Sequence, residues 1–154
     1  VFIVFISYLF FQLLNYVPNY FKEVNSQRLR AEAYQVSELL VNDVGQPANW
    51  NEDQSNIKRL GLLDRTRSQT NFISLGKITA FQNICSANYA DVVKLLGVDD
   101  DLKVLFIDKN SEVPLIDCSS PEAPSRIQAD IKRTVAYRTS SGELSFGELT
   151  VQMW

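Results

Sequence analysis

The chain has 154 residues, a formal net charge of −3 and no histidine. This acidic balance argues against a nucleic-acid-binding protein, which would need a basic face. The lack of histidine removes the commonest general base and metal ligand. All 15 Lys and Arg and all 18 Asp and Glu residues lie after residue 21. Residues 22–154 therefore have the composition of an ordinary soluble domain, long enough to bury its own core.

Residues 1–21 contain no charged side chain, and 16 of these 21 residues are apolar or aromatic. A helix of about 20 such residues matches the hydrocarbon core of a bilayer, so this stretch qualifies as a membrane span. A cleavable secretory signal and a plain single-pass anchor are the alternatives. The first is disfavoured because Lys22-Glu23-Val24-Asn25 is a poor cleavage site. We interpret the start at Val1 as a processed N-terminus.

The apolar stretch continues without a linker into an amphipathic helix over residues 22–44. Apolar residues recur there at steps of 4, 3, 4 and 4, which places them on one helical face: Leu29, Ala33, Val36, Leu40 and Val44. Gly45 and Pro47 are expected to stop the helix. Pro18 is the one break in the pattern and predicts a kink or local unwinding. We thus expect residues 1–44 to form a helix with a hydrophobic protruding half and a packed half.

Residues 45–154 are predicted to form a head domain. Short helices are expected in its first part. Asn51 is expected to cap a helix that ends near Leu60, with Trp50 buried beneath it. Residues 64–70 are predicted to form a polar surface loop. Two further helices are expected, over residues 75–84 after a Ser74 cap and over residues 89–96 between Asn88 and Gly97.

From residue 102 onward the pattern is typical of β-strands. Two hairpins are predicted, with strands over 102–108, 113–118, 127–139 and 143–154. The hairpin turns are residues 109–112 and 140–142, and a loop over 119–125 joins the hairpins. The sequence therefore predicts an α+β fold with a mainly antiparallel sheet of about four strands packed on the long helix.

Two groups of acidic residues are interpreted as surface groups rather than metal ligands. Asp99-Asp100-Asp101 lacks the alternating ligands and the glycine of a calcium loop, so it is interpreted as a solvated entry to a strand. Asp108, Asn110 and Glu112 do alternate, but Val113 stands where that loop needs glycine. We expect no catalytic residue, no metal and no cofactor, and a protein that is not an enzyme.

Cys85 and Cys118 are the two cysteines of the chain. In an oxidising exterior they would form a disulfide, which we favour over two buried free thiols. Closing a loop of roughly 32 residues would stabilise the fold by about 3 to 4 kcal/mol.

Four stretches of the sequence carry a resemblance to a known family: the start VFIVFISYLFFQLL, the continuation RLRAEAYQVSELLVNDVGQPANW, the pair GLL and NFISLGKI (residues 61–63 and 71–78) and the end LTVQMW (residues 149–154). They resemble the corresponding stretches of archaeal pilin-like proteins, which are made with class III signal peptides cut just before the hydrophobic helix. Phe5 stands where many bacterial pilins carry a carboxylate, which points to the archaeal group.

The resemblance implies a structural subunit of an archaeal type IV pilus-like extracellular filament. The partners would be copies of the chain itself, the cell membrane before assembly, the prepilin peptidase and the pilus assembly machinery. The alternative is a single-pass membrane-anchored surface domain, or a minor pilin that does not itself form the filament. The filament core would be built from apolar residues of the first stretch: Phe2, Ile3, Phe5, Ile6, Leu9, Phe10, Phe11, Leu13, Leu14 and Val17.

Overall fold

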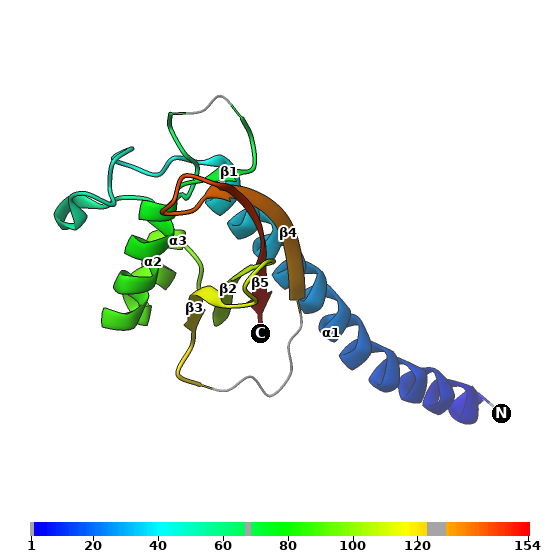
Figure 1. Cartoon of the computed structure of the whole chain (residues 1–154). Coiled ribbons are helices and arrows are strands. Elements are labelled where there is room, and N and C mark those ends of the chain that lie inside the picture. The colour runs from blue at the N-terminus through cyan, green and yellow to red at the C-terminus, as the bar shows by residue number, and fades with distance from the viewer. Residues whose placement is uncertain (1, 67–68, 123–128) are drawn as a thin grey trace.

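The computed structural model describes residues 2–66, 69–122 and 129–154. One long helix, α1 (Phe2–Asn42), precedes an α+β head. In Figure 1 the C-terminal half of α1 lies against the sheet of the head, whereas its N-terminal half extends away from the head. The predicted α+β class with a long N-terminal helix is confirmed.

The head contains a five-stranded sheet in the order β1-β4-β5-β2-β3. The two predicted hairpins, β2–β3 and β4–β5, are antiparallel. Strand β2 also pairs antiparallel with β5, and the added strand β1 pairs in parallel with β4. Part of the predicted loop, residues 123–125, and the predicted start of the third strand at 127 lie outside the described residues, as do residues 67–68 of the predicted polar loop. The strands are β1 (Phe72–Ile73), β2 (Leu102–Asp108), β3 (Pro114–Ser119), β4 (Ala129–Arg138) and β5 (Leu144–Met153).

One face of the sheet forms the core together with the helices. Leu102, Val104 and Phe106 alternate along β2 toward this face and are fully buried, as the period-two geometry of a strand requires. Helix α1 packs on β4 and β5, and α2 (Leu75–Ala87) packs on β3 and on α3 (Tyr89–Leu96). Residues from all three helices and from the sheet belong to a single hydrophobic cluster.

The packed half of α1 uses the helical face that its spacing predicts. Leu29, Ala33, Val36 and Leu40 are all at most 4% exposed. The helix ends at Asn42 rather than at residue 44. The left-handed backbone of Gly45 (φ +79°) then turns the chain, and a side chain on this glycine would collide with Trp50.

Polar contacts add to this packing between α1 and β4. Arg133 donates hydrogen bonds to the Ser37 hydroxyl at 3.2 Å and to the Glu38 carboxylate. Its guanidinium carbon also lies 4.7 Å from the centre of the Tyr34 ring. Hydrogen bonds from Asn42 and Arg133 hold the pKa of Glu38 below its usual value, although some desolvation opposes them. The charged form of Glu38 is therefore the one that the fold favours.

The predicted helix from Asn51 to Leu60 is wrong. The structure has turns there and a single 3-10 turn, η1 (Gln54–Asn56), capped by Asp53. Gln46 pairs with Arg59 across this segment, whereas a ten-residue helix would separate its ends by about 15 Å. Trp50 is fully buried, as expected, and its indole N–H donates to the Gly61 carbonyl at 2.9 Å. Long-range pairing therefore overrides the local capping signal.

The two later helices lie close to their predicted positions. Asn88 caps α3 by accepting a hydrogen bond from the Ala90 N–H, and Gly97 ends it in the left-handed conformation. Helix α2 begins after Ser74 but extends to Ala87, three residues past the predicted end. The Ser74 side chain makes no capping hydrogen bond.

Cys85 of α2 and Cys118 of β3 are joined by a disulfide, with their Cα atoms 5.7 Å apart. The bond ties α2 to an edge strand of the sheet. The Asp117 N–H, next to Cys118, also donates to the Gln82 side chain of α2 at 2.8 Å. This edge is therefore fixed to α2 by one covalent bond and one hydrogen bond.

Lys77 is a buried cation that connects three segments of the head. Its side chain is part of α2 and only 3% exposed. The ammonium Nζ donates to the carbonyls of Val44, 2.6 Å away, and Leu63, 2.9 Å away. Burial lowers the pKa of Lys77, and the negative charges of Asp64 and Asp43 partly oppose that shift.

We predict that Lys77→Met lowers the free energy of unfolding by about 1 to 3 kcal/mol, because two carbonyls lose their donor inside the fold. Lys58→Met is the matched control, since Lys58 is exposed, and it should change stability by no more than about 0.5 kcal/mol. Chemical denaturation of both variants provides the measurement. Equal effects of the two substitutions would show that the Lys77 hydrogen bonds contribute nothing.

Asp108 organises the turn between β2 and β3. One carboxylate oxygen accepts from the Ser111 N–H and hydroxyl, at 2.9 and 2.7 Å, and the other accepts from the Ser145 hydroxyl at 2.7 Å. Hydrogen bonds from Ser111 and then Ser145 hold the pKa of Asp108 far below its usual value. The carboxylate is thus satisfied by donors of the turn and of the neighbouring strand β5, in keeping with the turn interpretation.

We predict that this carboxylate makes the fold acid-sensitive. Its pKa is lowered in the folded state, so its stabilisation is complete above the unfolded pKa of about 4 and is lost as the pH falls toward the folded value. Asp108→Asn should be less stable than the native chain at pH 7 and should lose less stability between about pH 5 and pH 2. Unfolding curves across this range test the prediction, and parallel pH profiles for the two proteins would contradict it.

Candidate functional site: the exposed half of the long helix

The N-terminal half of α1 makes an exposed apolar rod. Leu29 is buried at 1% exposure and is the first such residue among those of the helix whose burial is described, whereas its neighbour Arg28 is 53% exposed at the side chain. We call residues 2–28 the free half of α1. At 1.5 Å per residue it is about 40 Å long. Figure 1 shows it pointing away from the sheet, with the N-terminus at the far end.

Every residue predicted for the filament core lies on this free half. Their side chains are between 44% and 79% exposed, so the head covers none of them. These residues are Phe2, Ile3, Phe5, Ile6, Leu9, Phe10, Phe11, Leu13, Leu14 and Val17. Such a run greatly exceeds the scattered apolar residues of an ordinary surface, and large exposed apolar patches mark protein or membrane contacts.

The exposed surface is larger than the predicted set. Further large apolar side chains on the free half are at least 45% exposed: Val4, Tyr8, Tyr16, Tyr20, Phe21 and Val24. The apolar composition of residues 1–21 already indicated that these side chains would be exposed, except for Val24, which lies outside that stretch. The position of the head boundary near Leu29 was not predictable, because it depends on where β4 and β5 end beside the helix.

This helix is long and apolar enough to cross a membrane, judged by length and composition. Among the described residues of its apolar 18-residue window, none is buried within the protein. By this measure the helix is compatible with a membrane span or with a signal sequence.

Pro18 lies inside α1, which is helical on both sides of it. The local unwinding allowed by the sequence is therefore not seen. Proline has no N–H, so the helix loses the hydrogen bond to the Leu14 carbonyl at this point. A kink at Pro18 stays a prediction.

An ion pair marks the place where α1 leaves the head. Arg28 lies 2.7 Å from the carboxylate of Asp100 and 3.5 Å from that of Glu32. The expectation that residues 99–101 form a merely solvated strand entry missed this contact of Asp100. The pairing depends on a fold that brings residues 28 and 100 together, and the sequence offered no local signal for it.

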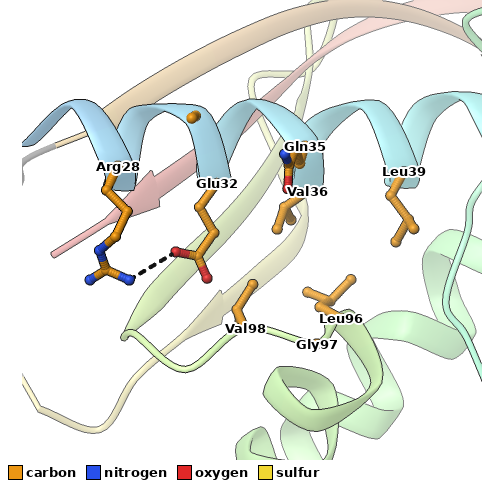
Figure 2. Close-up of a pocket in the computed structure, with 9 residues that line it drawn as sticks. Arg28, Glu32, Gln35, Val36, Leu39, Leu96, Gly97 and Val98 are labelled. Carbon is orange, nitrogen blue, oxygen red and sulfur yellow. Dashed lines mark ion pairs between the residues drawn. The ribbon is translucent and has the colours of Figure 1, made fainter. Parts of the chain in front are cut away.

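A groove of about 390 Å³ runs beside this ion pair, between α1 and the end of α3. Figure 2 shows Arg28 and Glu32 at one end of the groove and the aliphatic side chains of Leu39, Leu96 and Val98 further along it. Arg28 and Glu32 are the charged groups among its nine lining residues. The groove therefore offers an aliphatic wall beside one ion pair.

Among the described residues, no cluster of three or more His, Cys, Asp or Glu side chains is arranged to hold a metal ion. The feature that distinguishes this molecule is thus the free half of α1. Comparisons of the chain with protein families, curated proteins and solved structures found no match.

The burial pattern predicts that the head folds without the free half. A chain that starts at Asn25 should be soluble and unfold cooperatively, because none of the residues before Leu29 whose burial the structure describes is buried. A chain that starts at Ala33 lacks Leu29 and the ion pairs of Arg28, and it should be less stable by about 2 kcal/mol or more. Denaturant unfolding of the two truncated chains is the measurement. Equal stability, or failure of the longer chain to fold, would contradict this division.

Proposed function

We propose that the chain is a structural subunit of an archaeal type IV pilus-like extracellular filament. The observation that carries the proposal is the unbroken passage of α1 from an exposed apolar half to a half packed on its own head. A helix of this kind needs an apolar environment for one half and water for the head. Lipid before assembly and a bundle of identical helices afterwards would meet both needs.

Assembly in this proposal exchanges one apolar environment for another. Residues 2–21 span about 30 Å, which matches the hydrocarbon core of a bilayer. The transfer from lipid to a helix bundle brings little hydrophobic gain, because lipid tails are as apolar as the side chains. Side-chain packing between copies must therefore fix the geometry, and large aromatic residues such as Phe5 and Phe10 supply most of the contact area.

The disulfide and the resemblance to archaeal pilin-like proteins support an extracellular head. Disulfides such as Cys85–Cys118 persist in oxidising environments. The partners would be further copies of the chain, the membrane, the prepilin peptidase and the pilus assembly machinery. The alternative function is a membrane-anchored surface domain or a minor pilin, which the apolar span alone would support equally well.

We predict that Phe10→Asp abolishes filaments and leaves the head folded. Phe10 is 64% exposed on the free half, and an aspartate at the centre of a span costs about 2.5 to 3.5 kcal/mol. Filaments sheared from cells that produce each variant are measured by immunoblot and microscopy.

Two controls make this test specific. Phe146→Asp places the same charge on β5, at a side chain that is 49% exposed on the head, and Phe10→Leu keeps the span apolar. Both should yield normal filaments. Normal filaments from Phe10→Asp would contradict the proposal, and native chain confined to the detergent-extracted membrane would favour the anchored surface domain.

A further inference from the structure

A line of polar residues runs along the free half of α1. Its members follow one another at steps of 4, 3, 4, 3 and 4: Tyr8, Gln12, Asn15, Asn19, Lys22 and Ser26. These five steps cover 18 residues, which is five turns at 3.6 residues per turn, so the line runs straight along the helix. All three amide residues of the first 21 positions lie on this line.

The opposite side of the free half is apolar. From Ile6 to Val24 the positions half a turn away from the line carry aliphatic and aromatic residues: Ile6, Phe10, Leu13, Val17, Phe21 and Val24. These side chains are between 44% and 65% exposed. The free half therefore has one polar line and one apolar face, although its overall composition is that of a membrane span.

A hydrogen bond joins two residues of the polar line. The side-chain amide of Gln12 donates to the Tyr8 hydroxyl at 2.8 Å, one helical turn away. A glutamine amide has two N–H donors and a carbonyl that accepts twice, which exceeds what this bond uses. In hydrocarbon such groups need protein partners, because neither water nor lipid tails can pair with them.

We propose that the polar line is the surface through which two copies of this chain pair side by side in the bilayer. A second copy presents the same line, and amide groups are self-complementary because each one donates and accepts. Heads on the same side of the membrane require parallel helices, which brings Gln12 of one copy next to Gln12 of the other. Lys22 on the line and its neighbour Glu23 carry opposite charges near the water-facing end. Polar groups of this kind are known to hold transmembrane helices together.

The inference rests on the proposed function only in placing the free half in lipid. The pairing adds the face through which the copies contact each other. The apolar side of the free half then faces outward, toward lipid or toward further copies. The apolar side then remains available while the polar line is paired.

Cysteine cross-linking of the full chain in lipid vesicles tests this pairing. The native cysteines are joined to each other, so one introduced cysteine reports on contact between copies. Val4→Cys lies next to the polar line, and Ile6→Cys lies on the opposite side; both positions are exposed and aliphatic. Mild oxidation at low protein density should give several-fold more dimer for Val4→Cys than for Ile6→Cys.

A second substitution in the Val4→Cys chain tests the role of the amide. Gln12→Leu should weaken dimerisation by roughly 3- to 30-fold, the range found for polar contacts between membrane helices. Val17→Leu, on the opposite side, is the matched control and should leave dimerisation unchanged. Both variants remain at least as apolar as the native span, so both should enter vesicles.

Two results would overturn the pairing alone. One is equal cross-linking of Val4→Cys and Ile6→Cys in vesicles that contain the chain, and the other is undiminished dimerisation of Gln12→Leu. Failure of the native chain to enter vesicles would overturn the proposed function and the pairing together.

Discussion

One continuous helix, α1, has one half that packs in the core of the head and one half with exposed apolar side chains, and the rest of the structure depends on this constraint. The half of α1 after Leu29 is a core element of the head, with Ala33 and Leu40 fully buried. The half before it exposes aromatic and aliphatic side chains along about 40 Å. Because the two halves are one continuous helix, whatever covers the free half also fixes the position of the head.

Several contacts attach the packed half of α1 to the head. The sheet packs on α1 through β4 and β5, and Arg133 adds hydrogen bonds to Ser37 and Glu38 at the same contact. Lys77 fixes the segment that follows α1, because its ammonium group donates hydrogen bonds to the carbonyls of Val44 and Leu63. The disulfide fixes the far edge of the sheet to α2. Together these contacts connect α1 to the sheet, to α2 and to the segment that follows α1.

Local patterns predicted much of this fold, and long-range contacts account for what they missed. The steps from Leu29 to Leu40 predicted the buried face of α1, and both hairpins followed from alternating residues and turn signals. The segment after Trp50 carried a capping signal, but the pairing of Gln46 with Arg59 prevents a helix there. Strand β1 has two residues and is held by its pairing with β4 and by a bridge from Ile73 to Leu63. The exposed surface was readable from composition, whereas the contact of Arg28 with Asp100 was not.

The central claim is that copies of the chain bury the free half of α1 in a filament outside the cell. Immunogold electron microscopy of material sheared from native cells tests it most directly, with an antibody raised against residues 25–154. The account predicts filaments of regular width that carry gold along their whole length. Sheared material without labelled filaments, together with all of the chain in detergent extracts of the membrane, would contradict it.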